Sequence, residues 1–179
     1  SVKGTGGSYW DGSVVLAKYL EQNPELVRDK FLLELGSGLG FTSVAAKVLG
    51  AAQVVATDLC EVLPVLETNV RTNEVDVFVT EIDWNFPKYI KSDLVICSDV
   101  LWLVDLVYPF TNTLFTNLSE SNKAIICDKL RSLEVRNEFF KLLKEFKLEY
   151  RELGTMHGHD IWEVFKQTPG GLERNSELN

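Results

Sequence analysis

Cysteine is scarce in this sequence of 179 residues, which contains only Cys60, Cys97 and Cys127. Their odd number and wide separation argue against a disulfide framework, and no pair has the spacing of zinc ligands. No apolar run approaches the ~20 residues that a membrane-spanning helix needs. We therefore expect a protein with no bound metal and no membrane segment. The expected compartment is reducing, namely the cytoplasm, with the nucleus as a second setting.

Positive charge is also in short supply, because 18 lysines and arginines face 26 acidic residues and give a net charge of −8 at pH 7. This charge repels phosphate backbones, so a nucleic-acid substrate is disfavoured. A basic protein surface or a cationic side chain is the better electrostatic match. Residues 1–7 lack the basic and apolar segments of a secretory signal. Because the sequence begins with Ser1, we expect further residues before it in the natural chain.

The remaining composition is that of an ordinary globular protein, with 45% hydrophobic and 25% charged residues. The length fits one domain, and no repeat or internal linker is present. We expect a single domain over residues 1–170, in which residues 1–24 form an N-terminal segment and a helix. Residues 171–179 are polar and are expected to be disordered. We expect a monomer, because no additional apolar stripe is left over.

Short apolar runs alternate with segments of helical periodicity along most of the chain. The expected strands are residues 31–35, 53–57, 76–82, 94–97 and 124–127. The expected helices are residues 14–20, 40–49, 61–72, 104–118 and 134–146. This alternation predicts a parallel sheet with helices on both faces. Two further strands, 148–153 and 161–165, are separated only by residues 154–160. That link is too short for a crossover helix, so these strands should form an antiparallel hairpin.

The strongest local signal is the segment Glu-Leu-Gly-Ser-Gly-Leu-Gly at residues 34–40, between a strand and a helix. Glycines there allow a sharp turn and a close approach of a ligand to the backbone. The segment is also compatible with a simple tight turn, or with a dinucleotide fingerprint, which requires glycine where this chain has Phe41. A dinucleotide sets its pyrophosphate on the helix N-terminus, whereas S-adenosylmethionine carries no phosphate. Glu34 additionally suits a cationic ligand that bears an amino group.

Acidic residues follow three further strands, where open α/β sheets bind their ligands. Asp58 is placed to accept hydrogen bonds from ribose hydroxyls, although it could instead cap the next helix. Asp83 and Trp84 follow the third strand, where they could meet an adenine or simply close the sheet edge. Asp99 follows the fourth strand and could hold an amine at the reaction centre, or cap the helix after it.

These segments together resemble the class I, seven-β-strand S-adenosylmethionine-dependent methyltransferases, and among them the methyltransferase-like protein-lysine methyltransferases. The resemblance covers residues 4–166 and rests on the order and spacing of residues 7–11, 16–20, 34–40, 57–59, 83–84, 98–102 and 159–161. It implies a three-layer, doubly wound, Rossmann-like α/β fold. The implied sheet has seven strands in the order 3-2-1-4-5-7-6, mostly parallel, with a C-terminal antiparallel hairpin.

The resemblance also implies a role for each matching residue. The implied S-adenosyl-L-methionine ligands are Trp10, Glu34, Gly36, Ser37, Gly38, Asp58, Leu59, Asp83, Trp84 and Ser98. The implied catalytic residues are Asp99 and Trp102, because Asp99 begins the family's Asp-x-x-Tyr motif, which positions the target lysine. Here Trp102 replaces the tyrosine. An indole cannot accept a hydrogen bond, but it can form an aromatic wall or a cation–π contact.

The implied activity is transfer of a methyl group from S-adenosyl-L-methionine to a lysine side-chain amine of a protein substrate, with S-adenosyl-L-homocysteine as the product and no metal. Two alternatives remain open, namely a methyltransferase acting on a small molecule and a catalytically weak, cofactor-binding interaction module. A nicotinamide-dependent dehydrogenase is disfavoured by Phe41 and by the terminal hairpin.

Overall fold

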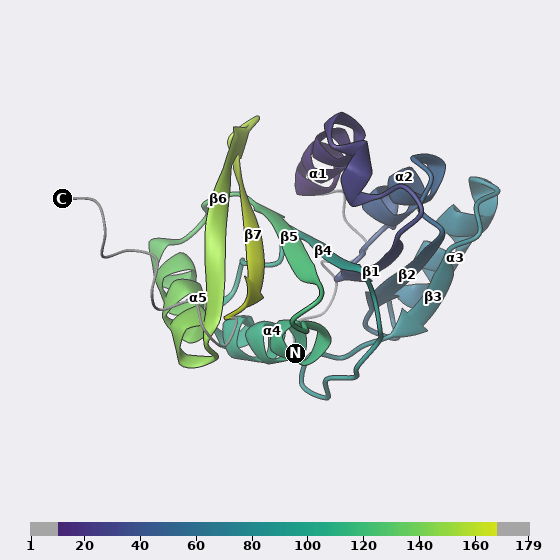
Figure 1. Cartoon of the computed structure of the whole chain (residues 1–179). Coiled ribbons are helices and arrows are strands. Elements are labelled where there is room, and N and C mark those ends of the chain that lie inside the picture. The colour runs from purple at the N-terminus through teal and green to yellow at the C-terminus, as the bar shows by residue number, and fades with distance from the viewer. Residues whose placement is uncertain (1–10, 168–179) are drawn as a thin grey trace.

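The structure is a computed structural model that describes residues 11–167. Its centre is a seven-stranded sheet of order β3-β2-β1-β4-β5-β7-β6 (Figure 1). The strands are β1 (Phe31–Leu35), β2 (Gln53–Asp58), β3 (Phe78–Glu81), β4 (Leu94–Ser98), β5 (Lys123–Asp128), β6 (Leu148–Met156) and β7 (His159–Lys166). The first five strands pair in parallel, and β7 pairs antiparallel with both β5 and β6. The strand order and the C-terminal hairpin expected from the sequence are therefore confirmed.

The helices form two layers, one on each face of the sheet (Figure 1). They are α1 (Asp11–Gln22), α2 (Phe41–Val48), α3 (Leu63–Thr72), α4 (Val104–Asn117) and α5 (Leu133–Glu145), with a short 3₁₀ helix at Pro24–Leu26. Apolar side chains of α1, α2 and α3 belong to one buried cluster, and those of α4 and α5 belong to another. The parallel strands β1, β2, β4 and β5 are buried on both faces as a result, which explains their continuous apolar sequences. No described helix has the length and apolarity needed to cross a bilayer.

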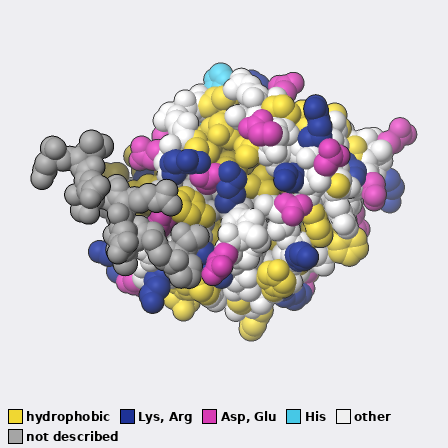
Figure 2. All heavy atoms as spheres, viewed as in Figure 1, with side chains coloured by type: hydrophobic (Ala, Val, Ile, Leu, Met, Phe, Trp, Pro, Cys, Tyr) yellow, Lys and Arg dark blue, Asp and Glu magenta, His cyan; other side chains and the backbone are white. Residues whose placement is uncertain are grey.

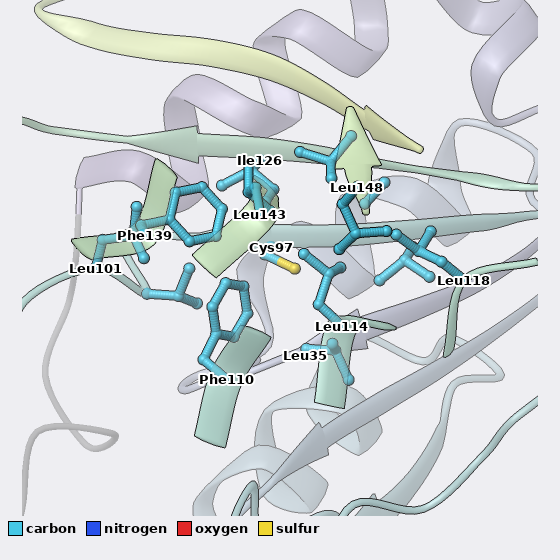
Figure 3. Close-up of a cluster of buried hydrophobic side chains, with 14 of the residues drawn as sticks. Leu35, Cys97, Leu101, Phe110, Leu114, Leu118, Ile126, Phe139, Leu143 and Leu148 are labelled. Atoms are coloured by element: carbon cyan, nitrogen blue, oxygen red, sulfur yellow. The ribbon is translucent and has the colours of Figure 1, made fainter. Parts of the chain in front are cut away.

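Phe110 of α4 and Phe139 of α5 lie among aliphatic side chains in one of the two clusters (Figure 3). Phe110 and Phe139 are fully buried, and their ring centroids lie 6.0 Å apart. They pack against Cys97 of β4 and Ile126 of β5 in the same cluster. This packing fixes the carboxyl ends of the central strands, where the candidate site residues lie.

The hairpin is tighter than the sequence predicted. Only His157 and Gly158 connect β6 to β7, and both have positive φ angles, 49° and 77°. Left-handed angles at both positions are characteristic of a two-residue hairpin turn. The expected link at residues 154–160 was wrong because β6 continues through Gly154, where the strand register shifts. A strand can absorb such a glycine as a bulge. Trp10 and residues 171–179 lie outside the described residues.

Candidate active site

The glycine turn after β1 is held against β2 by backbone hydrogen bonds. The amides of Gly36 and Ser37 donate to the carbonyl of Thr57 at 3.0 and 2.9 Å. The Ser37 hydroxyl accepts from the Thr57 amide at 3.0 Å. Gly36, Gly38 and Gly40 have φ angles of 74°, 53° and 82°. Residues other than glycine rarely adopt such left-handed φ angles, so the turn depends on its glycines.

Asp58 lies at the end of β2, beside the glycine turn. Its carboxylate accepts from the Gly38 amide at 2.7 Å and from the Leu59 amide at 2.8 Å. The helix α3 begins at Leu63 with no side-chain cap, so Asp58 does not cap it. Burial raises the pKa of Asp58, and the two amide donors oppose this shift. Each oxygen accepts one of these two bonds, which leaves acceptor capacity for hydroxyl donors of a ligand.

Glu34 is the buried acid of this turn, with its side chain at the end of β1. The Ser43 hydroxyl donates to its Oε2, and Oε1 has no hydrogen-bond partner among the described residues. Burial raises the pKa of Glu34 to about 7, against the opposing effect of the Ser43, Thr42 and Ser37 side chains. A buried carboxyl oxygen without a donor is costly. A cationic or hydrogen-bonding ligand near the turn would reduce this cost.

The raised pKa of Glu34 predicts a pH-dependent stability. The folded protein binds a proton more tightly than the unfolded chain between pH 4.5 and about 7, so stability should fall as the pH rises through this interval. The shift corresponds to about 3 kcal/mol in the free energy of unfolding. Thermal unfolding from about pH 5 to about pH 8 should therefore show a smaller decline for Glu34→Gln than for the wild type. Parallel declines in the two proteins would contradict this assignment.

Trp84 packs between the glycine turn and α4. It is half-buried, its ring centroid lies 5.1 Å from that of Phe110, and a Cβ on Gly36 would come within 3.0 Å of its Cζ2. Asp83 closes a local turn, because its Oδ1 accepts from the backbone amide and the side-chain amide of Asn85 at 2.9 and 3.0 Å. Ser98, at the end of β4, is half-buried. Asp83 and Trp84 therefore follow β3, Ser98 ends β4, and these two strands flank β1 and β2 in the sheet.

Asp99 differs from Glu34 and Asp58 because it is hydrogen-bonded to an arginine side chain. Its side chain is 1% exposed, and its φ of 52° is left-handed. Its Oδ2 accepts from the Gly12 amide of α1 at 2.8 Å, and its Oδ1 accepts from Arg131 Nη1 at 2.7 Å. The helix α4 begins after Leu103 without a side-chain cap, so Asp99 does not cap it. Trp102 is half-buried in the loop between Asp99 and this helix.

Gly12 is confined by the Asp99 carboxylate. A Cβ built on Gly12 would lie 2.5 Å from Asp99 Oδ2, closer than any real contact of this kind. We expect Gly12→Ala to lower the free energy of unfolding by about 1–3 kcal/mol through overpacking. Thermal unfolding measures this effect, with the exposed Lys18→Ala as a control on the same helix. The cost should shrink in an Asp99→Ala background, and an equal cost there would place its origin elsewhere.

Three polar residues near Asp99, namely Asp128, Arg131 and His159, were not predicted as site residues from the sequence. Asp128, at the end of β5, is buried and accepts from the Leu101 amide at 3.0 Å. Burial raises the pKa of Asp128 to about 7, and the nearby Asp99 adds to this rise. The rule that located the other acids, an acid after a parallel strand, would have found it. Arg131 carries no sequence signal of its own, because only the fold brings it to Asp99.

The residues present fit S-adenosylmethionine. The predicted ligands include acids and no lysine or arginine, which suits a ligand whose sulfonium and ammonium outweigh its one carboxylate. Asp58 keeps acceptor capacity beside the turn, and no residue in the described part of the chain donates to Glu34 Oε1. Among residues 11–167, no group of three or more potential metal ligands occurs.

Known lysine methyltransferases share sequence with this chain. The human electron transfer flavoprotein beta subunit lysine methyltransferase is 38% identical over 101 residues, which cover 55% of this chain and 38% of that protein. The mouse protein N-lysine methyltransferase METTL21A is 30% identical over 152 residues, covering 80% of this chain and 69% of that protein. The chain thus spans well under half the length of the first of these relatives.

Solved structures share the fold at low sequence identity. The Thermus thermophilus 16S rRNA N2 G1207 methyltransferase, in complex with AdoMet and guanosine, superposes with a TM-score of 0.68 at 17% identity, covering 91% of this chain and 45% of that one. The Synechocystis magnesium protoporphyrin IX methyltransferase with bound SAH superposes with a TM-score of 0.65 at 14% identity. The match covers 88% of this chain and 83% of that one. A family model described as lysine methyltransferase matches residues 1–146. With its class I methyltransferase fold and this match over most of its length, the chain belongs to the lysine methyltransferase family.

Proposed function

We propose that this protein transfers the methyl group of S-adenosyl-L-methionine to the side-chain amine of a lysine in a protein substrate, releasing S-adenosyl-L-homocysteine. The observation that carries the proposal is the convergence of Glu34, Asp58 and the glycine turn at the carboxyl edge of a methyltransferase sheet. The names of the matched relatives, which are lysine methyltransferases, favour lysine as the acceptor.

The cofactor would lie along the carboxyl ends of β1, β2 and β4. In this proposal Gly36, Ser37 and Gly38 line it through their backbone, and Asp58 accepts its ribose hydroxyls. Trp84, with Asp83, meets the adenine. The further proposed ligands are Trp10, Glu34, Leu59 and Ser98. When bound, the cofactor supplies a methyl group that its sulfonium charge has already activated.

The chain's own task is then to align the target amine and to exclude water from it. An aligned nucleophile within ~3–3.5 Å gains much of the rate that positioning can provide. The half-buried Trp102 would desolvate the target lysine and so lower its pKa, whereas the carboxylate of Asp99 would raise it. Asp99 therefore serves better as an orienting acceptor than as a strong base.

The proposed substrate is a protein surface with an accessible lysine. The net charge of −8 favours such a partner over nucleic acid. On the face shown in Figure 2, acidic and basic side chains of the described residues are interspersed. We further propose a monomer that acts in the cytoplasm, with the nucleus as a second location. Its single domain would span residues 1–170, with residues 1–24 covering the cofactor.

A methyl-transfer assay on cell lysate tests the function directly. The purified chain is incubated with methyl-labelled S-adenosyl-L-methionine and lysate, and the protein, nucleic-acid and small-molecule fractions are counted separately. We expect a labelled protein band whose hydrolysate contains methylated lysine, and no such band with Asp58→Ala. Label only in a small product would favour the small-molecule alternative. A chain that binds the cofactor but labels nothing would favour the interaction module.

A further inference from the structure

His159 turns its ring nitrogen Nε2 toward Asp99. Its side chain is 2% exposed at the start of β7, and its Nδ1 lies 3.2 Å from the carbonyl oxygen of His157. A carbonyl can only accept, so in the neutral imidazole this contact places the proton on Nδ1 and makes Nε2 an acceptor. Nε2 has no hydrogen-bond partner among the described residues and lies 3.7 Å from Asp99 Oδ1. In this tautomer two buried acceptors face one another, and no residue within 11–167 donates to both of them.

Arg131 is the outermost group of this cluster. Its Nη1 donates to the same Asp99 oxygen at 2.7 Å, and its side chain is 27% exposed, against 1% for Asp99 and 2% for His159. It belongs to the exposed loop between β5 and α5. A second cation that is to reach Asp99 Oδ1 must therefore compete with the Arg131 guanidinium. The cluster is already built to hold a cation at this place.

We propose that Asp99 Oδ1 and His159 Nε2 together receive the target lysine, which displaces the Arg131 guanidinium. This inference rests on the proposed function. The two acceptors are close enough for one nitrogen to donate to both at ordinary hydrogen-bond distances of ~2.8–3.0 Å, and an ammonium carries three donors. Asp99 alone favours the charged ammonium, whereas methyl transfer requires the neutral amine. The ammonium gives its proton to water before methyl transfer. A neutral imidazole accepts an N–H from either form, so His159 would keep the nitrogen in place after this loss.

Two substitutions of His159 separate this role from a structural one. In His159→Gln the side chain reaches far enough to replace the Nε2 acceptor. In His159→Asn it replaces only the Nδ1 donor that meets His157. We expect His159→Asn to raise KM for the protein labelled in the lysate by about ten- to a hundredfold, because one hydrogen bond to a charged group is lost. The same variant should lower kcat. His159→Gln should stay within about threefold of the wild type. If His159 had only a structural role, His159→Asn would be the more active of the two variants, because only asparagine keeps the bond to the His157 carbonyl.

Arg131 supplies an independent check of opposite sign. Arg131→Met removes the competing cation, so KM for the same protein should fall by about tenfold. Arg136→Met is the matched control, since Arg136 pairs with Asp160 rather than with Asp99 and should leave KM unchanged. Calorimetric cofactor affinity should be unchanged in all four variants, and thermal unfolding with cofactor confirms that each is folded.

The outcomes separate the two proposals. If the wild-type chain labels no protein, the proposed function fails, and this inference fails with it. If the wild type is active but His159→Asn matches it, or Arg131→Met fails to lower KM, only the inference is overturned.

Discussion

Asp58→Ala should weaken binding of S-adenosyl-L-methionine by about a hundredfold or more, the largest loss of cofactor affinity expected from any single substitution in this chain. In the proposed complex the Asp58 carboxylate accepts two ribose hydroxyls, and each charge-assisted hydrogen bond contributes about 1.5–3 kcal/mol. The same carboxylate holds the Gly38 amide at 2.7 Å, so its removal also loosens the glycine turn. Isothermal calorimetry measures the resulting loss of affinity for the cofactor and for S-adenosyl-L-homocysteine.

Two controls make this result interpretable. Glu61→Gln alters an exposed acid near Asp58 and should leave cofactor affinity unchanged. Asp58→Asn retains one acceptor oxygen for Gly38 while losing the charge, so it should bind the cofactor with intermediate affinity. Cofactor affinity that is unchanged in Asp58→Ala would overturn the ribose assignment.

Asp99→Asn should have the opposite signature, with intact cofactor binding and a loss of turnover of about a hundred- to a thousandfold. Truncating or neutralising one partner of a buried charged pair costs about 2–5 kcal/mol in binding, and here the lost partner is the one that orients the target nitrogen. Steady-state methylation of the protein labelled in the lysate measures the loss, and calorimetry follows the cofactor.

The exposed Asp105, in the first turn of α4, provides a matched control as Asp105→Asn and should retain full activity. Asp99→Asn also weakens the internal pair with Arg131, so thermal unfolding is needed to show that inactivity does not reflect unfolding. Loss of cofactor affinity in Asp99→Asn would place this residue on the cofactor side of the site instead.

Much of the fold could be predicted from the sequence because local signals were sufficient. Apolar runs such as Phe31–Leu35 and the glycine-rich segment after it define a buried strand and a turn without reference to distant residues. Asp58, at the end of β2, and Asp83 and Asp99, after β3 and β4, followed from one rule about ligand sites in open α/β sheets. The turn at His157 and Gly158 was missed because Gly154, a residue typical of loops, is absorbed inside β6.

The partners of the candidate catalytic acid could not be predicted in this way. Asp99 is separated by 87 residues from Gly12 and by 32 residues from Arg131. Neither partner belongs to a pattern that periodicity or spacing reveals, since a glycine in a helix and an arginine in a loop are both common. Only the packing of α1 and of the β5–α5 loop against the end of β4 brings them to one carboxylate.

The hydrogen bond from Gly12 to Asp99 limits how far this chain can be shortened within α1. A shortened protein that starts beyond the first turn of α1 would lose the amide that donates to the buried Asp99 carboxylate, and Oδ2 would then need another donor. Deletion of that turn should therefore disturb Asp99, which follows β4, although the deleted residues lie far from it in the sequence.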